Sequence, residues 1–411
     1  MSHANLPVET IVIVGAGQAG ASAILALRAQ QYQGKIILIG DEVHLPYERP
    51  PLSKEVLLQP ESYKVEILSE DKLTQLGVEH IAGQAVLKLD PSQHRVHLQD
   101  GRQIHYDKLL LATGGAARRL PNLDALGQHV YTLRNLDDAL ALLPVLQAER
   151  HIVLVGGGVI GLELASSARA KGCKVTVLEL GHRLMGRSTP EIFADFLLTQ
   201  HRSHAVDVYL NTQIQHCQLT ADQVEITLDN GEVLLADAVI YGVGIIPNAQ
   251  LAQDAGLAVD FAIQVDENCQ TSAADIYAAG DVATQLRADG AYRRVETWEN
   301  ANLQAEIFAR HVMGVAHPQP NPAWFWTDQL NVNYQFVGDM AAHEWFVRGE
   351  MDPNAEQPTF ILFGVSDQQI VAAITVNAAK EMRHLKKMIA KQAPFCAEQH
   401  LDVAQALRSL V

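Results

Sequence analysis

The residues of this 411-residue chain best suited to chemistry are six glycines in two motifs of one form. Each motif reads Gly-x-Gly-x-x-Gly and follows a short apolar run. The glycines are Gly15, Gly17 and Gly20 in the first motif and Gly156, Gly158 and Gly161 in the second. In such a motif the first glycine permits a tight turn, the second lets the backbone approach a pyrophosphate, and the third lets helix and strand pack closely. Two such motifs can hold two dinucleotides, which suits the relay of a hydride from a nicotinamide to a flavin.

The sequence around each motif predicts the strand–helix–strand unit that must position it. Alanine- and leucine-rich helices are predicted at 19–30 and 159–171, and apolar strands follow at 35–39 and 174–178. A helix that begins at the motif directs free N–H groups and the positive end of its dipole toward the phosphates. We therefore predict two Rossmann-like dinucleotide-binding folds in an α/β protein.

A carboxylate about 20 residues beyond the last glycine of such a motif contacts the ribose. In the second unit this residue is Glu179, whereas in the first it is Asp41 or Glu42, and the sequence leaves both open. A carboxylate accepts hydrogen bonds from a 2′-hydroxyl and repels a 2′-phosphate, so Glu179 favours NADH over NADPH. Arg183 and Arg187 lie close downstream and keep the phosphate alternative open.

Composition and charge exclude several classes of function. The chain has 47 acidic and 31 basic side chains and a net charge of -16, which disfavours nucleic acid or an anionic membrane as the main partner. No apolar run reaches the roughly 18 residues that a membrane helix needs. The amino-terminal segment has no basic start and no small-residue cleavage site, so we expect a cytoplasmic protein.

The cysteines and histidines show no spacing typical of a metal site or a redox dithiol. The four cysteines are Cys173, Cys217, Cys269 and Cys396. They are far apart in the sequence, so we expect free thiols with no redox role and no bound metal. His201 and His204 are predicted to be surface residues.

Three further apolar segments, at 109–114, 238–244 and 276–281, end in small-residue turns or in Gly-Asp. In this order around two glycine motifs, they resemble the two-dinucleotide flavoprotein disulfide reductase superfamily. The resemblance implies an FAD-binding domain in two pieces with an NAD-binding domain between them. The expected boundaries are 1–114 and 247–322 for the FAD-binding domain, 115–246 for the NAD-binding domain, and 323–411 for a small C-terminal α/β domain.

The same resemblance implies roles for individual residues. Asp281 would hold non-covalently bound FAD through hydrogen bonds, and the helix beginning near Trp298 would direct its N-terminus at the flavin pyrimidine edge. Further FAD contacts are expected from Arg49, Lys54, Thr113, Gly114 and Gly280, beside the first glycine motif and Asp41 or Glu42. Further NAD contacts are expected from Glu163, Arg187 and Gly244, beside the second motif and Glu179.

The segment 45–54 separates the branches of this superfamily. Disulfide-reducing members need a cysteine early in the FAD-binding domain, and this segment contains none. Electrons would therefore pass directly from flavin to an external acceptor. Segments 45–54, 157–165 and 322–329 resemble the ferredoxin reductases of Rieske-type aromatic-ring dioxygenases, together with putidaredoxin and rubredoxin reductases. The runs 298–302 and 335–340 resemble the reductases of 3-phenylpropionate/cinnamate dioxygenases.

This branch implies an NADH:ferredoxin oxidoreductase that passes electrons singly to a [2Fe-2S] Rieske-type ferredoxin. Lys54 and Glu163 would form a charge pair by flavin N5. In the alternative interpretation, Lys54 is a surface lysine and Glu163 an acid favoured by a helix N-terminus. Trp324 and Trp326 would lie on one side of an extended segment. Trp324 is the preferred neighbour of the nicotinamide, with a core aromatic cluster as the alternative.

Beyond the proline-rich stretch 318–322, short alternating strands and two final helices are predicted. The helix 379–392 carries a basic stripe, spaced for one helix face, of Lys380, Arg383, Lys387 and Lys391. Lys386 flanks this stripe, which we interpret as part of a docking surface for an acidic ferredoxin, or else as a solvated face.

Two other functions stay open at this stage. One is an NADH oxidase or a reductase of a small organic acceptor. The other is a nucleotide-dependent interaction protein, a function that no extended basic region or targeting segment supports.

Overall fold

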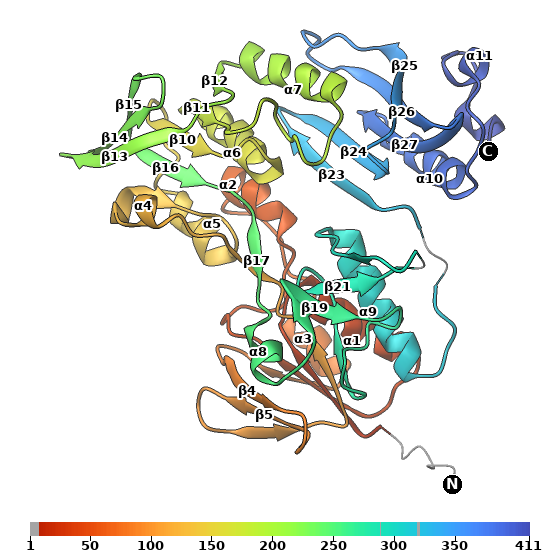
Figure 1. Cartoon of the computed structure of the whole chain (residues 1–411). Coiled ribbons are helices and arrows are strands. Elements are labelled where there is room, and N and C mark those ends of the chain that lie inside the picture. The colour runs from red at the N-terminus through yellow and green to blue at the C-terminus, as the bar shows by residue number, and fades with distance from the viewer. Residues whose placement is uncertain (1–7, 288, 319–320) are drawn as a thin grey trace. The chain divides into compact units, whose positions relative to one another are not determined.

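The computed structural model describes residues 8–287, 289–318 and 321–411, and the chain forms two compact units (Figure 1). Unit 1 comprises residues 1–49, 64–116 and 245–319. Unit 2 comprises residues 50–63, 117–244 and 320–411. Each unit is therefore assembled from three separate stretches of sequence.

Unit 1 is built on a parallel five-stranded sheet with the order β20-β7-β1-β2-β3. Its strands are β1 (Thr10–Val14), β2 (Lys35–Ile39), β3 (Val78–Ile81), β7 (Lys108–Leu111) and β20 (Ile276–Ala278). Its principal helices are α1 (Gln18–Ala29), α3 (Glu70–Gln75) and α9 (Trp298–Val312). The predicted strand–helix–strand unit around the first glycine motif is thus confirmed.

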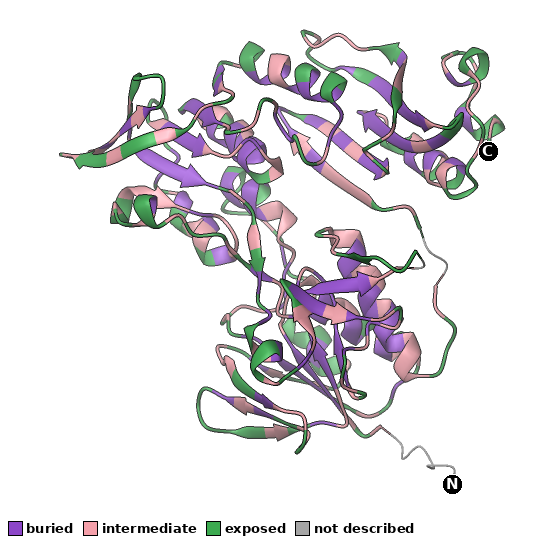
Figure 2. Cartoon of the chain, in the orientation of Figure 1, coloured by how far each residue is buried: buried purple, intermediate pink, exposed green. Residues whose placement is uncertain are grey.

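Strand β1 shows why this sheet reads as continuous apolar runs. Ile11 and Ile13 pack into a core with α1 and α9, whereas Val12 and Val14 point into a second core on the opposite face. Both faces of the sheet are covered by other elements, so neither set of alternating side chains points to solvent. Residues on both faces are therefore apolar. Figure 2 shows the resulting purple centre of the unit.

The second face of this sheet is covered by smaller elements. They are the antiparallel strands β4 (Val86–Asp90), β5 (Arg95–Leu98) and β6 (Gln103–His105), the sheet of β18 (Val259–Asp260), β19 (Ala262–Val265), β21 (Ala283–Leu286) and β22 (Tyr292–Arg293), and helix α8 (Gln250–Asp254). The short strands β8 (Gly115–Ala117) and β17 (Ile245–Pro247) pair with each other.

Unit 2 contains a second parallel five-stranded sheet with the order β12-β11-β10-β16-β9. Its strands are β9 (Val130–Tyr131), β10 (His151–Val155), β11 (Lys174–Leu178), β12 (Val206–Tyr209) and β16 (Ala238–Tyr241). Its helices are α4 (Pro121–Asp124), α5 (Leu136–Leu142), α6 (Val159–Ala170) and α7 (Glu191–Ser203). The antiparallel strands β13 (Ile214–Thr220), β14 (Gln223–Leu228) and β15 (Val233–Ala236) share a core with this sheet.

Residues 50–63 pack with unit 2, although they lie within the predicted first part of the FAD-binding domain. They form the 3₁₀ turn η1 (Pro50–Ser53) and helix α2 (Glu55–Leu58). Two hydrogen bonds fix this segment to α6, because Ser167 Oγ donates to the Ser53 carbonyl at 2.6 Å and Lys171 Nζ to the Leu57 carbonyl at 3.0 Å.

The C-terminal part of unit 2 is an antiparallel sheet with the order β23-β24-β27-β26-β25. Its strands are β23 (Trp324–Gln329), β24 (Val332–Gly338), β25 (Glu344–Glu350), β26 (Thr359–Ser366) and β27 (Gln369–Val376), followed by α10 (Met382–Ala390) and α11 (Ala397–His400). Helix α10 packs on one face, and α7 contacts the other through edge-to-face rings of Phe193 and Phe196 with Tyr334, Phe336 and Phe360. The predicted small α/β domain is confirmed as a fold.

The helix predicted at 379–392 is shorter than expected. Its first turn is the 3₁₀ turn η3 (Ala379–Glu381), which follows Asn377 in a left-handed conformation with φ of 48°, and α10 ends at Ala390. In the described parts of the chain, no helix is both long and apolar enough to cross a membrane.

Candidate active site

Both glycine loops have the geometry that a bound pyrophosphate requires. Gly15 and Gly156 adopt φ of 113° and 110°, and a Cβ on Gly15 would lie 2.1 Å from the Ala112 carbonyl oxygen. A side chain is therefore excluded at this turn by both conformation and space. A Cβ on Gly20 would lie 2.0 Å from the Gly15 carbonyl oxygen, so helix α1 rests directly on the loop.

The middle glycines differ, because open space faces them. A Cβ on Gly17 or Gly158 would meet no other atom within 4 Å. Each is the N-cap of its helix, α1 or α6, with no side-chain cap and no acidic residue in the first turn. Free N–H groups thus face an open approach at the positive end of a helix, which fits a dinucleotide phosphate at each loop.

Glu179 lies at the end of β11 against the second loop. Its carboxylate accepts hydrogen bonds from the backbone N–H groups of Gly157 at 2.7 Å and Gly181 at 2.6 Å. The Arg183 guanidinium donates to the Gly186 carbonyl at 3.0 Å, while Arg187 is exposed and its Nη1 lies near Gly244. The acidic group is therefore fixed where a ribose is expected.

In unit 1 the two candidate ribose carboxylates have different surroundings. Glu42 is engaged by Tyr47, whose hydroxyl donates to Oε2 at 2.5 Å, and by Arg49 Nη2, which donates to Oε1 at 2.7 Å. Asp41 is exposed. Burial disfavours the charged form of Arg49, yet the charges of Tyr47, Glu42 and Asp281 outweigh it and hold its pKa above the ordinary value. Arg49, Glu42 and Asp281 therefore share one electrostatic environment.

The remaining predicted FAD contacts lie in turns of unit 1. The Thr113 hydroxyl donates to the Asn248 carbonyl at 2.8 Å, and the Asn248 backbone N–H to Gly114 at 3.0 Å. Gly280 has φ of 82° and donates its N–H to Gln304 Oε1 on α9 at 2.8 Å. Trp298 begins α9, as predicted, and its indole N–H donates to Glu48 at 3.2 Å.

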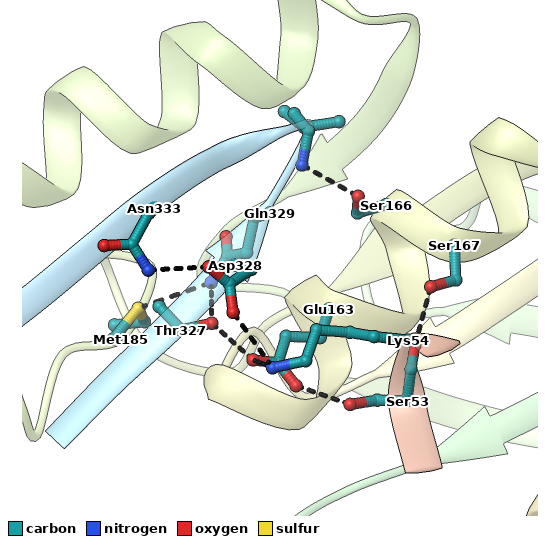
Figure 3. Close-up of polar contacts among 11 residues, drawn as sticks. Ser53, Lys54, Glu163, Ser166, Ser167, Met185, Thr327, Asp328, Gln329 and Asn333 are labelled. Atoms are coloured by element: carbon teal, nitrogen blue, oxygen red, sulfur yellow. Dashed lines mark hydrogen bonds and ion pairs between the residues drawn. The ribbon is translucent and has the colours of Figure 1, made fainter. Parts of the chain in front are cut away.

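Lys54 and Glu163 form a buried ion pair in unit 2 (Figure 3). Lys54 Nζ lies 3.1 Å from Glu163 Oε1 and 3.3 Å from Asp328 Oδ2, and the exposed fraction of the Glu163 side chain is 3%. Burial alone would lower the Lys54 pKa, but the charges of Glu163 and Asp328 hold it above the ordinary value. Lys54 is thus not a surface lysine.

Two buried hydroxyl groups complete the environment of Glu163. Ser53 Oγ donates to Glu163 Oε2 at 2.5 Å and Thr327 Oγ1 to Oε1 at 2.7 Å (Figure 3). The carboxylate therefore accepts three hydrogen bonds. Sequence reasoning did not single out Ser53, Thr327 or Asp328, although all three lie within segments that carried the family resemblance.

The two indoles of β23 are stacked on the same face. Trp324 and Trp326 have ring centroids 5.1 Å apart, and Phe325 stacks on Phe336 on the other face. Lys54 Nζ lies 6.0 Å from the Trp326 ring, so Trp326 is the indole beside the charge pair. Trp324 is one ring further away, under Lys386 Nζ at 4.5 Å.

A chain of amide groups links the outer indole to the charge pair. Trp324 Nε1 donates to Gln335, Gln335 to Asn333, and Asn333 to Asp328 Oδ1, at 3.1, 2.9 and 2.6 Å. Asp328 then contacts Lys54 through its other oxygen. These contacts orient the Trp324 indole, the Asp328 carboxylate and Lys54 relative to one another.

The four basic residues of the stripe are all exposed, as the docking hypothesis requires. Arg383 and Lys387 belong to α10 itself, whereas Lys380 lies in η3 and Lys391 is the C-cap of α10. Lys386 is partly covered because it packs on Trp324.

The prediction of a surface position for His201 is wrong. His201 lies on the face of α7 that packs against the C-terminal sheet and is fully buried, where its Nε2 contacts Gln329 Oε1 at 2.9 Å. The helical period, rather than polarity, decided its position. Among the described residues, no group of three or more His, Cys, Asp or Glu side chains could hold a metal ion.

The sequence and structure are similar to those of several known proteins. Residues 9–305 match the family described as pyridine nucleotide-disulphide oxidoreductase, and residues 324–411 match the family described as Reductase C-terminal. The 3-phenylpropionate/cinnamic acid dioxygenase ferredoxin–NAD(+) reductase component of Photorhabdus laumondii is 46% identical over 386 residues, which cover 94% of this chain and 97% of that protein.

Two solved structures are similar over almost the whole chain. One is putidaredoxin reductase in its covalent complex with putidaredoxin, with a TM-score of 0.92, 33% identity and coverage of 98% of both chains. The other is the ferredoxin reductase for the CYP199A2 system of Rhodopseudomonas palustris, with a TM-score of 0.92, 33% identity and coverage of 98% of this chain and 99% of that one.

Proposed function

Because the chain belongs to the pyridine nucleotide-disulphide oxidoreductase family, whose members use FAD and NAD(H), we propose that it is an NADH:ferredoxin oxidoreductase. Its acceptor would be a [2Fe-2S] ferredoxin that feeds a Rieske-type aromatic-ring dioxygenase. The similar protein from Photorhabdus laumondii carries that activity and a 3-phenylpropionate/cinnamic acid pathway in its name, which supports the same pathway here. The four cysteines are free, and we propose a cytoplasmic location because unpaired thiols are typical of a reducing compartment.

The observation that carries the proposal is the character of segment 45–54. It contains no cysteine, and its last residue is Lys54, paired with Glu163 at 3.1 Å. A protein thiol therefore cannot relay electrons from this segment, which favours direct transfer to an external acceptor.

A bound FAD would supply hydride chemistry toward NADH and one-electron chemistry toward a [2Fe-2S] acceptor. The chain binds and orients the cofactors. Gly17 and Gly158, which face open space, would leave room for the phosphates at the ends of α1 and α6, and Glu179 would accept hydrogen bonds from an adenine ribose of NADH. Arg49 and Asp281 would hold FAD, and Lys54 with Glu163 would hold a fixed charge pair at the site of hydride transfer.

The activity is tested by spectra and a coupled assay. Purified protein should be yellow, and one equivalent of NADH under anaerobic conditions should bleach it far faster than NADPH does. Cytochrome c reduction should then depend on added Rieske-type ferredoxin. Colourless protein that does not take up FAD, or cytochrome c reduction that is equally rapid without ferredoxin, would contradict the proposal.

We further propose that the basic stripe docks the ferredoxin, because four exposed cations stand out in a chain with a net charge of -16. The charge-reversal variant Lys387→Glu/Lys391→Glu should slow ferredoxin reduction at low salt and leave NADH–dye activity unchanged. Reversal of Arg95 and Lys88, exposed on β5 and β4 of unit 1, provides a control of equal charge change. Equal slowing by both variants would reject a specific docking role.

A further inference from the structure

A buried chain of hydrogen bonds leads from helix α7 to the Lys54–Glu163 pair. His201 Nε2 contacts Gln329 Oε1 at 2.9 Å, Gln329 Nε2 donates to Thr327 Oγ1 at 3.0 Å, and Thr327 Oγ1 donates to Glu163 Oε1 at 2.7 Å. His201, Thr327 and Gln329 each have an exposed fraction of 0%. All members lie in unit 2, and Figure 3 shows the part from Gln329 to Lys54.

The direction of every bond in this chain follows from the carboxylate at its end. A carboxylate only accepts, so the Thr327 hydroxyl must direct its proton at Glu163. The Thr327 oxygen can then only accept from Gln329, which turns the amide oxygen of Gln329 toward the histidine. His201 must therefore present an N–H at Nε2.

The surroundings of the histidine agree with this single tautomer. His201 Nδ1 is buried and has no hydrogen-bond partner, so a proton there would be an unsatisfied donor. Burial also lowers the His201 pKa to about 4, which keeps the ring neutral at working pH. The neutral ring with its proton on Nε2 is thus the form that both the site and the hydrogen-bond chain require.

We propose that His201 is a positioning residue: through Gln329 and Thr327 it fixes the hydroxyl proton that holds Glu163, and with it Lys54, in one geometry. The proposal rests on the role in hydride transfer proposed above for this charge pair. The same oxygen of Glu163, Oε1, accepts from both Thr327 and Lys54. If the Thr327 hydroxyl rotated its proton away, its lone pairs would repel that oxygen. The repulsion would displace Glu163 and, with it, the ion pair with Lys54. Helix α7 would thereby contribute to a reaction that none of its residues contacts.

The test uses the FAD-loaded enzyme and three variants of the hydrogen-bond chain in stopped-flow reduction by NADH. Thr327→Val removes the hydroxyl at nearly constant volume, and His201→Phe removes the ring N–H. Thr327→Val should lower the rate constant of flavin reduction about tenfold, the expected effect of losing one hydrogen bond to a charged group. His201→Phe loses a hydrogen bond to a neutral amide and should lower this rate constant about threefold to tenfold. Both variants should leave the NADH dissociation constant within about twofold. Thr327→Ser restores the donor and should regain most of the rate.

Two substitutions on α7 serve as matched controls. Thr199→Val removes a hydroxyl that donates to the Asp195 carbonyl, and His204→Phe removes a partly exposed ring at the C-cap of α7. Both change helix α7 without touching the hydrogen-bond chain. A merely structural role of α7 would lower the rate in these variants as much as in Thr327→Val.

A second readout does not depend on turnover. In protein labelled with ¹⁵N-histidine, the signal lost in His201→Phe identifies residue 201. That signal should report a neutral ring protonated at Nε2 and unchanged between pH 6 and 9, and it should shift in Thr327→Val. A titrating ring, or a proton on Nδ1, would overturn the proposal.

The role of His201 and the role of the charge pair can be disproved separately. If Glu163→Gln slows flavin reduction but Thr327→Val and His201→Phe do not, the positioning role of His201 is wrong and the charge pair stands. If Glu163→Gln leaves the rate unchanged, the proposed role of the charge pair is wrong and the role of His201 falls with it.

Discussion

Replacement of Glu163 by glutamine should strongly destabilise unit 2, because it leaves Lys54 as a buried cation with one remaining counter-charge. At 3.1 Å and an effective dielectric constant of about 20, the two charges attract each other by about 5 kcal/mol. Removal of one partner of a buried pair costs about 3–5 kcal/mol. Asp328 still lies 3.3 Å from Lys54, so we expect the lower end, about 3 kcal/mol.

The measurement is urea-induced unfolding of the FAD-saturated protein followed by tryptophan fluorescence. Three of the four tryptophans, Trp324, Trp326 and Trp345, belong to unit 2, so the signal reports mainly on that unit. In a heating experiment, a loss of about 3 kcal/mol in a body of about 230 residues should lower Tm by roughly 6–12 °C. Glu149→Gln, which breaks an exposed pair with Lys174 in the same unit, should cost at most about 0.5 kcal/mol.

A double-mutant cycle with Lys54→Met separates the pair from its surroundings. The double variant carries no buried charge at this position and should be less destabilised than the sum of the single variants, by about 2 kcal/mol. Additive effects would show that the two charges do not stabilise each other, and the reasoning about this site would be refuted.

Three further outcomes test other parts of the structure. Gly17→Ala should fold normally, because open space faces this residue, but it should weaken FAD binding. Gly15→Ala should fold poorly, because a Cβ there would clash with the Ala112 carbonyl. Equal FAD affinity in Gly17→Ala and wild type would argue against a phosphate at this loop. Glu179→Ala should raise the KM for NADH about tenfold and improve the relative use of NADPH, measured as the ratio of kcat/KM values. The folded-state pKa of His201, about 4, lies below the ordinary value of 6.5, so the unfolded chain binds the proton first. Stability should therefore fall by about 3 kcal/mol as the pH drops from 6.5 toward 4, and this acid-induced loss should be smaller in His201→Phe, as urea midpoints across this range would reveal.

The glycine loops could be predicted from sequence because their constraints are local. The positive φ of Gly15 and the contact of Gly20 with Gly15 arise within six residues, whereas the close approach of Ala112 to Gly15 does not. The two strands that flank each loop could be predicted for the same reason, because each is a short continuous apolar run. The pairing of Lys54 with Glu163 depended on family resemblance, because residues 109 positions apart share no local pattern.

The parts that sequence reasoning missed depend on distant packing. Ser53 and Thr327 reach Glu163 from segments more than 100 residues away on either side, and no periodicity marks them. His201 was misplaced because its polarity suggested solvent, whereas α7 is covered by β23 and β24. Whether Asp41 or Glu42 contacts the FAD ribose, and which tryptophan faces the nicotinamide, stay predictions, as do the domain boundaries.

The interleaved order of the chain has a consequence for how the protein emerges from the ribosome. Helix α1 packs on α9, and the first sheet receives its edge strand β20 only after residue 275 is made. At about 5–20 residues per second, the amino-terminal strands must wait roughly 15 to 60 seconds for these partners. Unit 2 also needs residues from its last stretch, 320–411. Neither unit can therefore complete its fold until its last stretch of sequence has been translated. The nascent polypeptide therefore exposes the edges of its parallel strands for that time, and expression at lower temperature or with chaperones that shield such edges should raise the yield of folded protein.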